Sequence, residues 1–123
     1  MKKNILVIDD DQAMLDSLDL ILSEEGYDVE TMIDGRSLEN ISPRYVPDII
    51  LIDYFLPDEN GIQIVRKLKK QKNMANTPII MMSAAYHLTK QNLSPEVDDF
   101  FSKPFDINKL MASIKQHLRK KKE

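Results

Sequence analysis

Short apolar runs and helically spaced apolar positions alternate along the whole chain. The runs at 5–8, 49–52 and 78–82 are continuous, which is typical of strands covered on both faces of a sheet. Weaker strand patterns occupy 29–33 and 97–102, and the second of these is aromatic. Each strong run ends abruptly at a polar residue. The pattern therefore predicts five strands.

Amphipathic helices are predicted between and after these strands. Their apolar positions fall within 14–22, 38–41, 64–68, 88–93 and 107–118. Gly26 is the expected stop of the first helix, and Pro43 limits the second. The stretch 84–97 is the least regular, because Pro95 interrupts it. Five strands alternating with five helices predict right-handed crossovers and one α/β domain over residues 1–123, with a parallel sheet covered on both faces.

Composition excludes several classes of protein. Hydrophobic residues make up 42% of the chain and charged residues 30%, as in an ordinary globular domain. The absence of cysteine excludes disulfides, thiolate metal sites and a cysteine nucleophile. The first apolar run ends at Asp9, which makes it too short for a signal peptide or a membrane span. We therefore expect a cytoplasmic domain that makes no contact with a membrane.

The net charge of −3 conceals a separation of charge along the chain. Residues 1–61 carry four Lys or Arg against fifteen Asp or Glu (−11), and residues 62–123 carry thirteen against five (+8). The bases lie mainly on two predicted helices, which favours solvated helix faces over direct nucleic-acid binding. The lysines at 120–122 are interpreted as a frayed helix tail. His87 and His117 are expected to be solvated surface residues, and a phosphotransfer role for either is the less favoured alternative.

Polar side chains follow the ends of the predicted strands, where an open parallel sheet binds its ligands. They are Asp9, Asp10 and Asp11 after the first strand, Asp53 after the third, Ser83 after the fourth and Lys103 after the fifth. Crowded carboxylates raise one another's pKa unless a cation lies among them. Hard oxygen ligands without cysteine or a well-placed histidine favour Mg²⁺, with Mn²⁺ as an alternative. Lys103 offers a mobile charge for a phosphate, and Ser83 offers a hydroxyl donor.

Asp53 is the predicted nucleophile of this cluster, because it ends a buried central strand and is held rigidly. An aspartate can form an acyl phosphate where a metal ion and a lysine offset the negative charges. Asp9 and Asp10 end the neighbouring strand and are better placed as metal ligands. Asp11 is expected to cap the helix that follows it.

Four motifs, in this order and spacing, resemble the receiver domain of bacterial two-component response regulators over essentially the whole chain. They are Ile-Leu-Val-Ile-Asp9-Asp10-Asp11, Ile52-Asp53-Tyr-Phe-Leu-Pro57-Asp-Glu-Asn-Gly61, Met82-Ser83-Ala84 and Phe101-Ser-Lys103-Pro104-Phe105. The resemblance implies a five-stranded, flavodoxin-like, doubly wound fold. It also implies a signalling domain of the single-domain chemotaxis or sporulation-relay type. Such a domain accepts a phosphoryl group from the phosphohistidine of a sensor histidine kinase or a phosphotransfer protein, and it catalyses only its own phosphorylation and slow dephosphorylation.

The resemblance also implies roles at the metal and phosphoryl site. Asp53 is the phosphoacceptor, and Asp10 and Asp53 ligate Mg²⁺ directly. Asp9 acts mainly through metal-bound water, and the main-chain carbonyl of Phe55 completes the protein ligands. Lys103 pairs with a phosphate oxygen, and its peptide bond to the following proline is expected to be cis.

A conformational switch is implied as well. Ser83 reorients to bond the phosphoryl group, and Phe100 fills the space that it leaves. Ser83 replaces a commoner threonine, and the segment from 83 to 103 is short for the family, so the fourth helix is expected to be short or irregular. Phe55 and Ala85 flank the site and cannot orient an attacking water, which predicts slow self-dephosphorylation.

Other functions stay open at this point. One is a pseudo-receiver, an interaction module that is not phosphorylated. Another is a small phosphatase of the haloacid-dehalogenase type, since Asp9-x-Asp11 follows a strand, although Ala13 stands where that class needs Thr or Val. A flavin binder is weaker, because no Ser/Thr/Gly-rich loop follows the first strand. The chain contains no predicted output domain, so a stand-alone regulator and the receiver half of a longer one are alternatives. We expect a monomer, with dimerisation on phosphorylation as the alternative.

Overall fold

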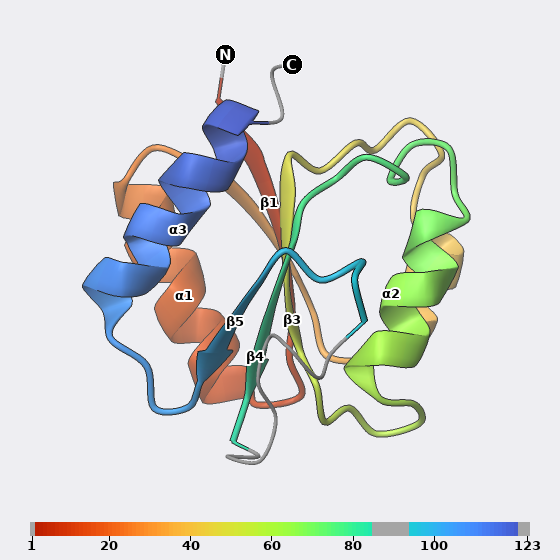
Figure 1. Cartoon of the computed structure of the whole chain (residues 1–123), viewed down its shortest axis with the longest axis horizontal. Helices are drawn as coiled ribbons and strands as arrows, with labels where there is room; N and C mark the ends of the chain where they lie inside the picture. The colour runs from red at the N-terminus through yellow and green to blue at the C-terminus, as the bar shows by residue number, and fades with distance from the viewer. Residues whose placement is uncertain (1, 85–93, 121–123) are drawn as a thin grey trace.

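Five parallel strands form one sheet in the order β2-β1-β3-β4-β5 (Figure 1). The computed structural model describes residues 2–84 and 94–120. In chain order the elements are β1 (Asn4–Ile8), α1 (Gln12–Glu24), β2 (Asp28–Met32), the 3₁₀ helix η1 (Arg36–Asn40), β3 (Ile49–Asp53), α2 (Gly61–Lys69), β4 (Ile79–Ser83), β5 (Asp99–Ser102) and α3 (Ile107–Lys120). Every pair of neighbouring strands is parallel. The predicted doubly wound, five-stranded α/β fold is confirmed.

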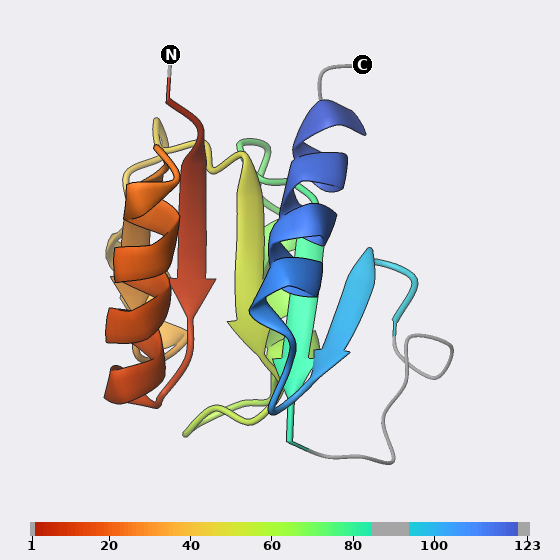
Figure 2. The same ribbon diagram turned by 90° about the vertical axis from the view of Figure 1, so that its left-hand side faces the viewer.

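The helices cover both faces of the sheet. Helices α1 and α3 lie on one face, and α2 with η1 lies on the other (Figures 1 and 2). Side chains of each strand alternate between two apolar cores, so that Ile5 and Val7 pack toward α1 and α3 while Leu6 and Ile8 pack toward α2. All four are fully buried. This double coverage explains why the strands read as continuous apolar runs.

Local signals set the limits of the first helix. The carboxylate of Asp11 accepts hydrogen bonds from the backbone N–H groups of Ala13 (3.0 Å) and Met14 (3.3 Å), which is the capping role expected for it. The helix ends at Glu24 with Glu25 as its C-cap, and Gly26 follows with a φ of 94°, a left-handed conformation that glycine adopts without steric cost.

Two of the five predicted helices differ from expectation or lie outside the described residues. The second is the short 3₁₀ helix η1, in which Leu38 is the buried residue. One buried side chain provides little packing for an α-helical turn, and Pro43 follows closely. The predicted fourth helix falls largely on 85–93, outside the described residues. The described part of the chain therefore contains three α-helices and one 3₁₀ helix.

The remaining expectations concern boundaries and hydrophobicity. The predicted short aromatic strand within 97–102 is β5, and Val97 packs into a core just before it. None of the helices in residues 2–84 and 94–120 has the length and apolar character needed to cross a bilayer.

Candidate functional site

The polar residues predicted at the strand ends meet at one edge of the sheet, the lower edge in Figure 2. Asp53 and Ser83 are the last residues of β3 and β4, and Asp9 and Lys103 directly follow β1 and β5. Backbone hydrogen bonds continue past the strand ends: Asp9 N–H donates to the Met32 carbonyl (3.0 Å) and Lys103 N–H donates to the Ser83 carbonyl (2.8 Å). The site residues are therefore positioned by the sheet itself.

A lysine joins two of the carboxylates. The Lys103 Nζ lies 2.7 Å from Asp9 Oδ2 and 3.6 Å from Asp53 Oδ2. Asp9 is 0% exposed and Asp53 is 6% exposed, so both carboxylates are shielded from water. The second oxygen of Asp9 accepts a hydrogen bond from the Asp11 N–H at 3.0 Å. Asp9 is thus held through both oxygens, and Lys103 is directed from Asp9 toward Asp53.

Three carboxylates converge beside this lysine. One ligand oxygen from each of Asp9, Asp10 and Asp53 can be chosen so that all three lie within 4.8 Å of one another. Asp9 and Asp53 are buried and Asp10 is exposed, so the cluster opens to solvent on the Asp10 side. Hard oxygen donors with an open side suit a divalent cation that keeps several waters. The donor set therefore fits the predicted metal site.

Burial and neighbouring negative charge both disfavour the ionised form of Asp53. Burial, followed by the charge of Asp9, raises the pKa of Asp53 from 3.8 to about 6, although Lys103 and a hydrogen bond from the Phe55 N–H act in the other direction. Burial alone would lower the pKa of Lys103, but its hydrogen bond to Asp9 and the charge of Asp53 outweigh burial, so that the pKa is raised. The edge thus carries more negative charge than one ammonium balances.

Gly61 shapes the loop after the acceptor strand, a role that sequence reasoning did not assign. A Cβ at this position would lie 2.6 Å from the Asp53 carbonyl oxygen and 2.9 Å from Met81 Cε. The Gly61 N–H donates to the Tyr54 carbonyl at 2.7 Å. A capping box formed by Asn60 and Gln63 then starts α2. The signal in the sequence was a glycine directly after Asn60, a preferred N-cap residue, a few residues past the end of β3.

The predicted switch pair lies on one face of the sheet. Ser83 is fully buried, and Phe100 is half-buried against the core that faces α2. Phe100 pairs in register with Met81, two residues before Ser83 on β4. Because side chains alternate along a strand, Ser83 and Met81 point to the same face as Phe100. The two predicted switch residues therefore lie diagonally across β4 and β5 on the same face, since Ser83 itself pairs with Ser102.

Two further expectations at this edge have different outcomes. The Lys103–Pro104 peptide bond is cis, as predicted. Phe55 is 52% exposed, and its backbone N–H donates a hydrogen bond to the Asp53 carboxylate. The predicted role of its carbonyl as a metal ligand stays a prediction. Ala85, the second flanking residue, lies outside the described residues.

His117 is buried, so the prediction that it is a solvated surface residue is wrong. Its Nδ1 lies 2.8 Å from the Ser113 carbonyl oxygen, one helical turn away. The Ser113 hydroxyl donates to Asp99 Oδ2 at 2.5 Å, and Asp99 Oδ1 accepts from the Phe100 N–H at 2.9 Å. This chain of contacts ties α3 to the start of β5. The missed signal was that His117 lies beside apolar residues on the buried face of the helix. His87 and residues 121–122 lie outside the described residues.

Comparison with known proteins agrees with this geometry. A family model described as the response regulator receiver domain matches residues 5–115. The chain is 31% identical over 118 residues to the DNA-binding dual master transcriptional regulator RpaA of a Synechocystis strain, covering 94% of this chain and 49% of RpaA. It therefore spans about half the length of that relative.

Solved structures show the same fold. A CheY-like response regulator receiver domain protein from Methanospirillum hungatei superposes with a TM-score of 0.87 at 28% identity, over 99% of this chain and 98% of that one. The response regulator TrrA from Thermotoga maritima, solved in complex with Mg²⁺-BeF, gives a TM-score of 0.81 at 26% identity, over 94% and 98% of the two chains. With the family match and the shared fold, the chain belongs to the response regulator receiver domains of two-component signal transduction.

Proposed function

We propose that this domain accepts a phosphoryl group on Asp53 in a Mg²⁺-dependent reaction. The donor is the phosphohistidine of a sensor histidine kinase or of a histidine phosphotransfer protein. The observation that carries the proposal is the position of Lys103 Nζ, 2.7 Å from Asp9 and 3.6 Å from Asp53, beside a cluster of three carboxylates. Lysine, metal ligands and an acceptor carboxylate are the groups that phosphoryl transfer to aspartate requires.

In the transfer step, a carboxylate oxygen of Asp53 attacks phosphorus while the P–N bond to the donor histidine breaks. The imidazole nitrogen keeps the electron pair of that bond. Asp9, Asp10 and Asp53 would hold Mg²⁺, which supplies positive charge for the phosphoryl oxygens when it is bound. Lys103 leaves its contact with Asp53 and pairs with a phosphoryl oxygen. TrrA, the Thermotoga relative solved with Mg²⁺-BeF, supports the assignment of this metal.

Phosphorylation then changes the surface at β4 and β5. Ser83 turns toward the new phosphoryl oxygens, and Phe100 moves into the space that Ser83 leaves. The shared face of the two side chains supports this coupling. Downstream partners recognise the altered surface.

The modification is made once per molecule and is long-lived. Phe55, two residues after Asp53, has an exposed aromatic side chain, and that side chain has no group that could position a hydrolytic water. The domain therefore stores a phosphoryl group rather than turning over phosphate esters as an enzyme. This favours a relay or a lasting signal.

The test is the intact mass of the chain after incubation with acetyl phosphate and Mg²⁺. We expect one added phosphoryl group, lost in Asp53→Asn and in the presence of a chelator. Asp58→Asn is the matched control, because Asp58 lies in the loop after β3 and pairs with Arg36 (2.8 Å) away from the cluster. An adduct that survives Asp53→Asn would contradict the proposal. Phosphate release in excess of protein would instead identify the phosphatase alternative, and no adduct at all would identify a pseudo-receiver.

A further inference from the structure

Helices α1 and α3 carry opposite charges on the same face of the sheet (Figures 1 and 2). Helix α1 has three Asp or Glu and no Lys or Arg, whereas α3 has four Lys or Arg and no Asp or Glu. Both helices begin at the carboxyl edge of the sheet, because each follows a strand that ends there. The outer surface of this layer therefore has an acidic helix and a basic helix that run in the same direction.

The exposed side of α1 has an acidic, apolar, acidic order. Asp16, Leu20 and Glu24 are spaced four residues apart, so they lie on one side of the helix. All three are exposed, and Leu20 is 62% exposed. The Asp16 carboxylate accepts a hydrogen bond from the uncharged Gln12 side chain (2.9 Å). These three residues, the α1 stripe, span about 12 Å at a rise of about 1.5 Å per residue.

The exposed side of α3 has the complementary order, which is basic, small, basic. Lys109 lies about one turn before Ala112, and Arg119 lies about two turns beyond it, so the three residues share one side of the helix. All three are exposed. This α3 stripe spans about 15 Å at the same rise per residue. The two stripes differ in length by about 3 Å, which flexible basic side chains can cover.

Charges on the opposite face pair within the chain, and those of the two stripes do not. On the α2 side, Lys67 Nζ lies 2.7 Å from Glu59 Oε1, and Arg36 Nε lies 2.8 Å from Asp58 Oδ2. Within residues 2–84 and 94–120, the acids of the α1 stripe and the bases of the α3 stripe form no ion pair. The charges of the two stripes are therefore available to a partner with the reverse pattern.

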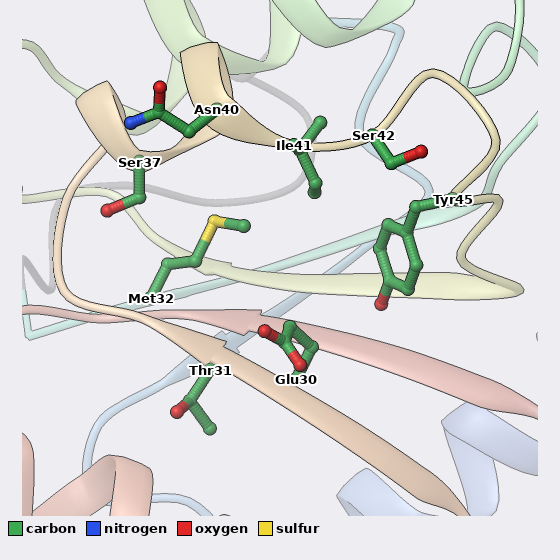
Figure 3. Close-up of a pocket in the computed structure, with 8 residues that line it drawn as sticks. All are labelled: Glu30, Thr31, Met32, Ser37, Asn40, Ile41, Ser42 and Tyr45. Carbon is green, nitrogen blue, oxygen red and sulfur yellow. The ribbon is translucent and has the colours of Figure 1, made fainter.

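The cavity beside β2 and η1, of about 480 Å³, offers no comparable set of charges (Figure 3). Among the described residues that line it, Glu30 is the charged one, and it is exposed to solvent. The buried Tyr45 hydroxyl has no hydrogen-bond partner, but its oxygen has less than 1 Å² of accessible surface, so a ligand in the cavity cannot reach it. The face formed by α1 and α3 is thus the better docking surface.

We propose that this face binds a second copy of the chain in an antiparallel, two-fold-symmetric dimer. A two-fold axis between α1 and α3 places α1 of each copy against α3 of the other, with the two helices running in opposite directions. The symmetry repeats every contact, so each pair occurs twice. Each acidic end of one stripe then faces a basic end of the other, with the apolar positions between them: Asp16 with the partner's Arg119, Leu20 with the partner's Ala112, and Glu24 with the partner's Lys109.

The dimer is weak, because an exposed ion pair contributes little and is screened by salt. One large apolar side chain per copy is covered, so hydrophobic burial adds little. We expect a dissociation constant of about 100 µM in low salt, and at least about tenfold weaker association in about 0.5 M NaCl. Sedimentation equilibrium of the full chain between about 10 and about 1,000 µM measures both values.

Charge reversal locates the interface. Glu24→Lys and Lys109→Glu should each weaken the dimer at least about tenfold, because the two-fold symmetry turns two attractive contacts into two repulsive ones. The double variant that combines both changes restores opposite charges and should associate as the parent chain does. Arg66→Glu on α2 is the matched control, since Arg66 is exposed on the other face and its reversal changes the net charge as Lys109→Glu does. Asp53→Asn should also associate as the parent chain does, which separates this interface from phosphoryl transfer.

Thermal melting of each variant separates loss of the interface from loss of the fold, and we expect unchanged melting temperatures because the altered residues are exposed. Monomers at every concentration would overturn the proposal. It would also be overturned by a folded double variant that associates as poorly as the single variants, or by equal weakening in Arg66→Glu and Lys109→Glu.

Discussion

Near the amino ends of the strands, three polar side chains join separate segments through backbone groups, whereas at the carboxyl ends a lysine joins two carboxylates. Near the amino ends, Asp48 accepts from the Asn4 N–H (2.7 Å) and Asp98 accepts from the Ile79 N–H (2.8 Å). The Thr77 hydroxyl donates to the Pro47 carbonyl at 3.1 Å. Each of these contacts joins two segments of the chain and adds stability.

The carboxyl ends carry the opposite arrangement. There Lys103 bridges Asp9 and Asp53, and Asp10 adds a third carboxylate to the cluster. Burial without enough positive charge raises the pKa of Asp53 to about 6, so this edge is costly to fold in the absence of a cation. The comparison shows that the two edges of one sheet have different roles. Contacts at the amino edge stabilise the fold, and the carboxyl edge holds charged groups that can bind a cation and a phosphoryl group.

Lys103→Met should have the largest effect, because it leaves a fully buried Asp9 without its cation. Removing one partner of a buried pair costs about 3–5 kcal/mol of unfolding free energy. The same variant should accept phosphate from acetyl phosphate much more slowly. Denaturant unfolding and intact mass measure the two effects. Lys67→Met is the control, since its pair with Glu59 lies at the surface, and it should change stability by less than about 1 kcal/mol. Equal losses in the two variants would remove the contrast between buried and exposed charge.

Gly61→Ala tests the backbone beneath the acceptor. Its Cβ would meet the Asp53 carbonyl oxygen at 2.6 Å, and a backbone atom in a central strand cannot move aside easily. We expect a loss of about 1–3 kcal/mol in denaturant unfolding. Gly35→Ala is the matched control, because its Cβ would meet side-chain atoms of Ile64 (Cδ1 at 2.7 Å and Cγ1 at 3.0 Å) and no backbone atom. If Gly35→Ala lost as much unfolding free energy as Gly61→Ala, the contact with the Asp53 carbonyl would not be the cause of the destabilisation.

Asp53→Asn should stabilise the metal-free domain by about 3 kcal/mol at pH 8. The ordinary pKa of an aspartate such as Asp53 is 3.8, and in the folded chain it is raised to about 6. The folded state therefore binds the proton more tightly than the unfolded state does. Stability is therefore lost as pH rises from about 4 to about 6, and that loss is absent in the variant. Unfolding free energies measured between pH 4 and pH 8 should converge at the acidic end.

Mg²⁺ sharpens the same prediction. The cation should stabilise the parent chain more than Asp53→Asn, because it restores charge balance to a complete set of carboxylates. A stability difference that is independent of both pH and Mg²⁺ would show that repulsion at Asp53 is not its cause.

Thr77→Val should have the smallest effect, and it belongs to the amino edge. Loss of the hydroxyl bond to the Pro47 carbonyl costs about 1 kcal/mol. Phosphorylation by acetyl phosphate should proceed at the parent rate. A slower rate would mean that the two edges are coupled through the sheet.

Much of this architecture could be predicted from the sequence, because a strand buried on both faces has little choice of residues. The apolar runs at 5–8 and 49–52 identified two of the three interior strands, and the acids that end them identified the site. Asp11 was recognised as a cap by its residue type and place. These signals are local, and the parallel topology brings them together.

Features that depend on tertiary contacts could not be predicted. Residues 36–40 form a 3₁₀ helix, and they bury a single side chain, that of Leu38. The apolar residues Leu38 and Ile41 alone do not reveal how much of this segment packs against the sheet, so its helix type could not be predicted. The burial of His117 depends on Ser113 and Asp99, which come from different elements. Tyr45 follows a proline-containing loop without periodicity, so its unsatisfied hydroxyl became visible only in the structure.

The most direct test of Asp53 as the acceptor is to locate the modification chemically. After incubation with acetyl phosphate and Mg²⁺, borohydride reduces an aspartyl phosphate to homoserine, and peptide fragmentation then identifies the altered residue. We expect homoserine at position 53, and none at Asp9, Asp10 or Asp58. Homoserine at any of those three positions, with residue 53 unchanged, would contradict the assignment of Asp53 as the phosphoacceptor.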